Sequence, residues 1–161
     1  MENVQYCFLS HLSGEKITDI ISKQKTRWLS DGINGKSYGN QLELYYHNGS
    51  YRNSWNPIFY GTLSENQDGT IIAGSFKTPL YAEIFIWIWR AMTILFTIFM
   101  LIIFFISSKN MSILLASIVP ISMFLFSFLL VRIGENMGQE NISNVLQFIE
   151  NGLNAAPLVK N

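Results

Sequence analysis

Two long apolar runs, residues 84–106 and 111–131, dominate the hydrophobic pattern of the chain. Each run reaches the roughly 20 helical residues that cross a hydrocarbon core of about 30 Å. Only Ser107-Ser108-Lys109-Asn110 separates them, and four residues suffice for no more than a tight turn. We therefore expect a transmembrane helical hairpin over residues 79–132, with both chain termini on one side of the membrane.

Residues 1–78 contain short stretches of hydrophobic positions spaced as in strands and helices, which predict a small soluble α+β domain. Residues 4–11 are apolar on both faces and indicate a buried strand. Ser13 is placed to cap a helix that ends near Arg27, and Glu15 is favourable in its first turn. This helix carries one apolar stripe, as an amphipathic helix does. The stripe consists of Ile17, Ile20, Ile21 and Trp28.

Antiparallel strands are expected next. Residues 31–35 contain two glycines and predict a loop, whereas residues 41–46 alternate like a half-buried strand. Asn48-Gly49 predicts a type I′ turn, which needs positive φ at both central positions. Residues 51–55 are then the expected return strand. Pro57 lacks a backbone donor and marks a strand break or a sheet edge.

A second strand pair, residues 58–64 and 70–77, is closed by Asn66-Gln67-Asp68-Gly69. A strand, a helix and about four antiparallel strands are most simply arranged as one sheet with the helix on one face. Thr78 and Pro79 then suit the N-cap and the first position of the first membrane helix.

Residues 133–161 predict a C-terminal amphipathic helix and a tail, with Gly152 near the end of the helix. We expect this helix to pack on the sheet, which one helix covers only in part. A helix lying on the membrane surface is the alternative, but Glu140, Glu150 and the absence of basic residues before Lys160 disfavour it. The apolar stripe consists of Ile142, Val145, Leu146, Ile149 and Leu153.

Charge is sparse and balanced, with 11 basic and 11 acidic side chains in 161 residues. A neutral chain argues against a nucleic-acid partner, which requires a basic surface. The lone Cys7 excludes an intramolecular disulfide and a paired-cysteine metal or redox site. The first residues lack a basic segment followed by an apolar block, so we expect no cleavable signal peptide.

Basic residues that flank the spans predict the orientation of the hairpin. Lys77, Arg90 and Arg132 lie on the domain side, and Lys109 alone lies in the short loop. This distribution favours a multi-pass protein of the inner (cell) membrane with both termini in the cytoplasm.

The chain carries no catalytic signature. His11 and His47 are its only imidazoles, and neither shares a motif with a nucleophile or a carboxylate. The carboxylates are scattered, without the spacing of a metal site. The two apolar runs hold no Asp, Glu, His or Lys, which disfavours a transporter, a proton channel or an intramembrane protease. We predict no enzyme activity, no cofactor and no metal.

Arg90 and Arg132 are the candidate contacts to lipid headgroups, because both lie at the expected membrane interface. The simpler interpretation of Arg90 is that its long side chain snorkels to that boundary. Glu83 and Glu135 could pair with the two arginines in place of lipid phosphates.

Within the second run, Pro120 predicts a kink, with Ser117 and Ser122 available to satisfy the freed carbonyl. The four-residue spacing of Ser112, Ala116 and Pro120 suggests packing against the first span.

The predicted sheet is rich in large rings. In one interpretation they pack beneath the helices on one face and rest against the membrane interface on the other. In another they line a groove for a lipid tail or an amphipathic peptide. The rings are Tyr38, Tyr45, Tyr46, Tyr51, Trp55, Phe59, Tyr60 and Phe76.

Two short segments carry a resemblance to a family. They are Tyr51-Arg52-Asn53-Ser54-Trp55-Asn56-Pro57, continuing through Tyr60-Gly61, and Gly69-Thr70-Ile71-Ile72-Ala73-Gly74. With the Leu12-Ser13-Gly14-Glu15 helix start, the chain resembles a family of small, mostly uncharacterised bacterial two-span membrane proteins. The resemblance implies the same architecture and no particular activity. The helix-then-sheet order is also distantly similar to half of a helix-grip lipid-binding fold, an analogy of fold alone.

Three functions follow as hypotheses. The favoured one is a non-enzymatic, membrane-anchored interaction or regulatory module that binds a membrane or cytosolic protein or its own copy. The second is binding of a lipid or apolar ligand by the membrane-proximal sheet. The third is a membrane-associated enzyme with His11 or His47 as base.

Overall fold

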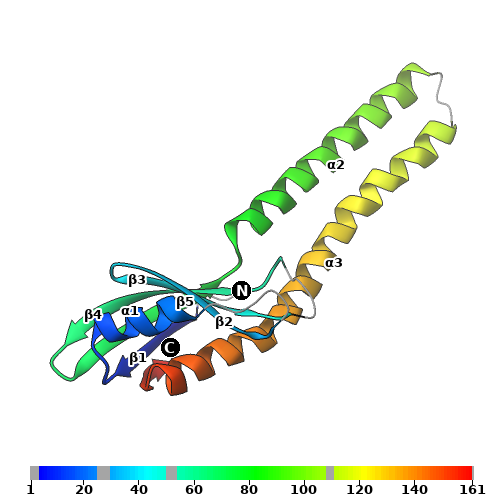
Figure 1. The fold of residues 1–161 in the computed structure, drawn as a ribbon. Helices are drawn as coiled ribbons and strands as arrows, with labels where there is room; N and C mark the ends of the chain where they lie inside the picture. Colours follow the sequence, from blue (N-terminus) through cyan, green and yellow to red (C-terminus); the bar gives the residue numbers. More distant parts are fainter. Residues whose placement is uncertain (1–3, 25–29, 50–53, 108–110, 161) are drawn as a thin grey trace. The chain divides into compact units, whose positions relative to one another are not determined.

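The chain folds into two compact units in a computed structural model (Figure 1). The first unit comprises Met1–Pro79 with Glu135–Asn161, and the second comprises Leu80–Gly134. Helix α3 (Met111–Gln147) therefore contributes residues to both. The structure describes residues 4–24, 30–49, 54–107 and 111–160.

A six-stranded antiparallel sheet forms the body of the first unit and gives the chain its α+β class. The strands lie in the order β2-β3-β4-β5-β1-β6. Strands β3, β4 and β5 were expected, whereas β2 and the C-terminal strand β6 were not predicted. The strands are β1 (Gln5–Ser10), β2 (Gly32–Tyr38), β3 (Gln41–His47), β4 (Ile58–Asn66), β5 (Gly69–Lys77) and β6 (Ala155–Lys160).

The loop predicted for residues 31–35 is wrong, because strand β2 begins at Gly32. Gly35 serves packing rather than a turn. A Cβ atom at Gly35 would lie 2.5 Å from Cγ2 of Ile21, so a side chain does not fit between the strand and the first helix. The turn between β2 and β3 lies instead at Gly39 and Asn40, where Gly39 has a φ of 58°.

The type I′ turn predicted at Asn48-Gly49 is also wrong, because neither residue has a positive φ. Strand β3 pairs with β2 and β4, and β4 begins directly after Pro57, which confirms the strand break there. The amide of Gly49 donates to a carboxylate oxygen of Asp31 at 2.7 Å, a bond to a side chain rather than to a return strand. Ser54 and Trp55 form a turn, and residues 51–53 lie outside the described residues.

The remaining strand predictions are confirmed. Strand β1 lies within the predicted range, and β4 pairs with β5 from Ile58 opposite Lys77 to Asn66 opposite Gly69. The predicted turn at Gln67 and Asp68 closes this pair.

Helix α1 (Gly14–Lys23) covers one part of the sheet with the buried side chains of Ile17 and Ile21. Ser13 precedes the helix, but its hydroxyl makes no capping bond, and only its carbonyl accepts from the amide of Ile17 at 3.0 Å. The predicted helix end near Arg27 is wrong, because α1 ends at Lys23 and Gln24 is its C-cap, whose amide donates to the carbonyl of Ile21. Trp28 lies outside the described residues.

The C-terminal part of α3 and the π-helical turn η1 (Phe148–Gly152) cover the rest of the same face. The predicted stripe is confirmed, because Val145, Ile149 and Leu153 are fully buried in the sheet core and Ile142 and Leu146 pack against it. The tail helix of the first unit therefore docks on the sheet. The whole core lies on one face of the sheet. Its strand residues are Phe8, Leu42, Leu44, Phe59, Leu63, Ile72, Phe76 and Ala155.

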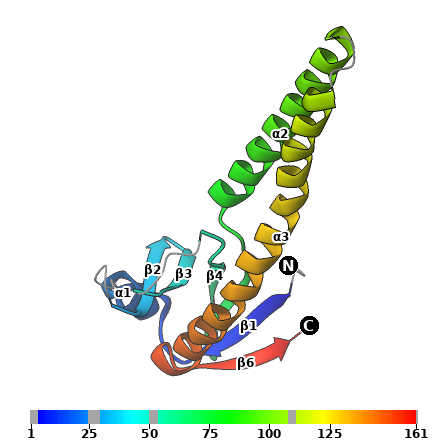
Figure 2. The same ribbon diagram turned by 90° about the vertical axis from the view of Figure 1, so that its right-hand side faces the viewer.

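Polar bonds fix both ends of this contact. Asn141, almost fully buried, donates from Nδ2 to Oδ1 of Asn56 at 2.7 Å, and Asn56 donates to the carbonyl of Tyr46. At the other end, the buried Ser10 hydroxyl donates to the carbonyl of Leu153. Asn154 then adopts a φ of 48° and turns the chain into β6, which lies beside β1 (Figure 2).

The second unit contains α2 (Leu80–Ile106) and the first part of α3. Helix α2 starts just after Pro79, so Thr78 and Pro79 precede the helix instead of forming its first turn. Large apolar side chains cover the outside of both helices, and the exposed fractions of Trp87, Phe105 and Ile106 reach 70%, 69% and 78%. Both helices are long and apolar enough to cross a membrane.

The small-residue stripe predicted on α3 is wrong in register. Ser112 and Ala116 are exposed, whereas Ser117, Pro120 and Ser127 are buried. With the half-buried Phe124, these positions are separated by steps of three, four and three residues, as expected for two antiparallel helices that face each other, whereas a strict step of four residues leaves that stripe. The hydroxyls of Ser117 and Ser122 donate to the carbonyls of Leu114 and Val119, not to the Ala116 carbonyl that Pro120 leaves without its usual donor.

Replacement of Ile149 by alanine tests the docking of the tail helix. We expect I149A to lower the free energy of unfolding of the first unit by about 2–5 kcal/mol, because it leaves a cavity in the sheet core. Pulse proteolysis across a urea series, in mild detergent, measures the change. The matched variant L158A, at a side chain that is 46% exposed, should change it by less than about 1 kcal/mol. Equal effects of the two variants would contradict the docked arrangement.

Candidate functional site

The two histidines lie at opposite ends of the sheet. His11 is exposed and follows β1 at the end where Ser10 lies opposite Thr70, whereas His47 ends β3 beside Gly32. Within the described ranges, no group of three or more His, Cys, Asp or Glu side chains is placed to hold a metal ion. The structure therefore does not assemble the predicted imidazole candidates into one site.

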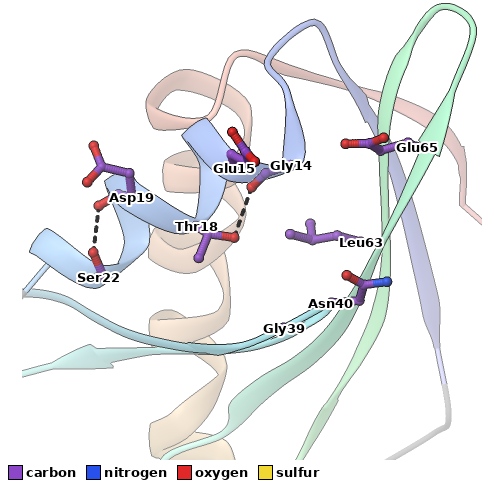
Figure 3. Close-up of a pocket in the computed structure, with 9 residues that line it drawn as sticks. All are labelled: Gly14, Glu15, Thr18, Asp19, Ser22, Gly39, Asn40, Leu63 and Glu65. Atoms are coloured by element: carbon purple, nitrogen blue, oxygen red, sulfur yellow. Dashed lines mark hydrogen bonds between the residues drawn. The ribbon is translucent and has the colours of Figure 1, made fainter.

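An acidic hollow of about 710 Å³ lies between α1, the β2–β3 turn and β4 (Figure 3). Three carboxylates line it and no basic side chain does. The carboxylate of Asp19 points away from that of Glu65, and it binds the ammonium of Lys23 at 2.6 Å. The hydroxyls of Thr18 and Ser22 donate to carbonyls of their own helix. The lining residues are Gly14, Glu15, Thr18, Asp19, Ser22, Gly39, Asn40, Leu63 and Glu65.

The carboxylates of Asp19 and Glu65 point apart, so these two groups do not form a carboxylate pair for acid–base chemistry (Figure 3). A shared proton or a bound cation requires carboxylates that converge on one point. The hollow was not predicted from the sequence, because its walls come from three segments that are far apart along the chain.

The second concave surface lies on the opposite face of the sheet, which no described helix of the first unit covers. We call it the tyrosine hollow. It has a volume of about 360 Å³ and combines two rings with one carboxylate and one ammonium group. Tyr38 is 62% exposed and Tyr60 is 36% exposed. The lining residues are Tyr38, Gln41, Leu42, Glu43, Tyr60, Gly61, Thr62 and Lys77.

The predicted aromatic surface is divided between the two faces. Phe59 and Phe76 are buried in the core with ring centroids 5.1 Å apart, and Tyr46 packs against that core. Tyr38 and Tyr60 line the tyrosine hollow on the other face. The hypothesis of a single groove lined by all the rings is therefore wrong, because alternate residues of a strand point to opposite faces. Tyr51 lies outside the described residues.

Arg90 contacts the neighbouring helix within the second unit. Its Nε donates to the hydroxyl of the fully buried Ser127 at 3.1 Å, and its guanidinium lies 4.0 Å from the ring centroid of Phe128. Ser127 in turn donates to the carbonyl of Phe124 at 2.6 Å. Arg90 thus uses one of its five N–H donors to bind α3.

The alternative ion pair between Arg90 and Glu83 does not form, and Arg132 is exposed without a hydrogen bond or ion pair to a described residue. Ser127, which the sequence interpretation did not single out, is the partner instead. A single serine in an apolar run gives no signal of its own, and only the step of three and four residues from Pro120 places it on the facing stripe.

Replacement of Ser127 by alanine tests the bond to Arg90. We expect S127A to destabilise the helical hairpin by about 1 kcal/mol, typical of a hydrogen bond between apolar helices. The matched variant S122A removes an exposed hydroxyl that binds only its own helix, so it should have little effect. Unfolding in mixed micelles of increasing SDS fraction measures both. The bond would be refuted if S127A proved as stable as S122A.

Comparisons with protein-family models, with curated proteins and with solved structures find no match to the chain. The resemblance to small two-span membrane proteins therefore remains a prediction from its two short motifs. Of the first motif, Ser54 to Pro57 form the turn and connection before β4. The second motif is the first part of β5, whose Gly74 has no room for a side chain, because a Cβ would lie 2.4 Å from the carbonyl oxygen of Tyr60. The described residues of both motifs therefore have structural roles in the sheet and in its connections.

Proposed function

We propose that the chain is a two-span membrane protein whose α+β unit is a non-enzymatic binding module at the membrane surface. The observation that carries the proposal is the apolar outer surface of α2 and of the first part of α3. Large rings and aliphatic chains are exposed along its whole length, far beyond the patch size of a soluble monomer. A helix of 27 residues such as α2 is about 40 Å long, which exceeds the hydrocarbon core.

Interfacial residues support the placement of the hairpin in the bilayer. Trp87 and Trp89 precede Arg90 on α2, and Arg132 follows the apolar run of α3. Tryptophan and arginine are favoured at headgroup depth, where a ring or a long stem is buried and the polar end stays wet. With one of its donors on Ser127, Arg90 keeps further N–H groups for a lipid phosphate, and Arg132 is exposed for the same role.

The excess of basic residues on the domain side supports an inner-membrane protein with both termini in the cytoplasm. The α+β unit would then face the cytosol. Its concave surfaces hold no converging catalytic groups among the described residues, which favours binding of a partner over a reaction. A partner protein, a second copy and a lipid are the classes that such a surface could bind.

Labelling with a membrane-impermeant maleimide tests the topology. In a C7S background, we expect S107C, at the end of α2, to react from outside intact spheroplasts. K16C, on the exposed side of α1, should react only after lysis, because the bilayer shields the cytosolic unit. Extraction of the unlabelled protein by alkaline carbonate is the control for insertion. Release by carbonate, or labelling of K16C in sealed cells, would refute the proposal.

A further inference from the structure

The tyrosine hollow carries one group of each charge, and neither is neutralised by the other. Glu43 and Lys77 both line it, yet they form no ion pair, and neither has a hydrogen bond to a described residue. Glu43 is half-buried on β3, and Lys77 is exposed at the end of β5. Facing groups of opposite charge that stay apart suit a ligand that carries both charges itself.

The sheet register fixes the spacing of the two charges. Glu43 lies opposite Tyr60, and Tyr60 lies opposite Ser75, two residues before Lys77. Two strand spacings and two residues along β5 separate the Cα atoms of Glu43 and Lys77 by about 12 Å. Glu43, Tyr60 and Lys77 lie on the same face of the sheet, so a small zwitterion that lies over Tyr60 can contact both charged groups.

The other lining residues select the kind of cation. The Gln41 amide oxygen is an acceptor beside Glu43, two residues along the same face of β3. The Thr62 hydroxyl donates to the Ala73 carbonyl at 3.3 Å and keeps its acceptor lone pairs. A primary ammonium has three donors and can satisfy these acceptors together with the carboxylate, which a quaternary ammonium cannot do.

The position of Lys77 in the chain favours a lipid as the source of the zwitterion. Only Thr78 and Pro79 separate Lys77 from Leu80, the first residue of α2. Three extended residues span at most about 11 Å, so Lys77 stays close to the start of a helix proposed to enter the bilayer. The ammonium of Lys77 is therefore within reach of headgroup phosphates.

We propose that the tyrosine hollow binds the zwitterionic headgroup of a phosphoethanolamine lipid, with its ammonium on Glu43 and Gln41 and its phosphate on Lys77. The proposal rests on the membrane anchoring proposed above. It assigns a ligand to the uncovered face of the sheet, which is distinct from the candidate headgroup contacts Arg90 and Arg132.

Native mass spectrometry of the full chain tests the proposal. The protein is released from discs that contain equal amounts of phosphatidylethanolamine, phosphatidylglycerol and phosphatidylcholine. We expect the wild type to retain phosphatidylethanolamine preferentially. E43Q should reduce this retention roughly tenfold, because it removes a charge-assisted hydrogen bond, and K77Q should reduce it as well. Thermal melts of both variants confirm that they fold.

Two matched variants control for charge alone. K16Q removes an exposed cation of α1, which packs on the other face of the sheet, and E65Q removes an anion of the acidic hollow. Both should retain phosphatidylethanolamine like the wild type. The proposal is overturned by a preference for phosphatidylglycerol or phosphatidylcholine, by an unchanged E43Q, or by equal losses in the controls. A lipid-free dimer that E43Q abolishes would also overturn it, in favour of a second copy.

Free O-phosphoethanolamine, titrated onto the protein in discs of phosphatidylglycerol alone, distinguishes a lipid from a soluble ligand. Millimolar or weaker binding fits a headgroup whose lipid is held in the membrane, whereas micromolar binding that E43Q abolishes would assign the hollow to a soluble ligand and overturn the lipid proposal. Failure of the anchoring itself is seen separately, as release of the protein by carbonate.

Discussion

The first unit depends on the burial of one face of its sheet beneath the end of helix α3. Helix α1 supplies Ile17, Ile21 and the half-buried Ile20 to this face, which leaves the part over β1 and β5 for residues from the C-terminal segment. Val145, Ile149 and Leu153 fill that part without exposure to solvent. Apolar burial on this scale is the main favourable term for a domain of about 100 residues.

The elements whose hydrophobic pattern extends over many residues could be predicted from the sequence. The two apolar helices, the stripe of α1 and the stripe that ends at Leu153 are examples. Predictions from patterns of two to five residues were wrong where tertiary contacts determined the local structure instead. Gly35 resembles a loop residue but is a strand residue that lies beneath Ile21, and the amide of Gly49 is bound by Asp31. Strand β6 was missed because Ala155–Lys160 has no alternating pattern of its own.

The candidate sites were harder to predict than the elements. Lys77 and Glu43 are 34 positions apart in the sequence, and only the register of β3, β4 and β5 brings them to one hollow. The same holds for Ser127, whose importance follows from the position of Arg90 on another helix. A charge or hydroxyl in isolation carries little information about its partner. The aromatic residues were recognised as unusual, but their division between two faces required the strand boundaries.

The neighbours β1 and β6 are separated in the sequence by both apolar helices, and this has a consequence for biosynthesis. During translation β1 is made before the two helices, whereas its outer neighbour β6 emerges only after them. Until then the sheet of β1 to β5 has its apolar face covered by α1 alone. Such an intermediate is prone to aggregation, and pairings between distant segments form slowly. The hairpin is therefore synthesised before the domain closes, so the last strand of the sheet is added only after both apolar helices have been made.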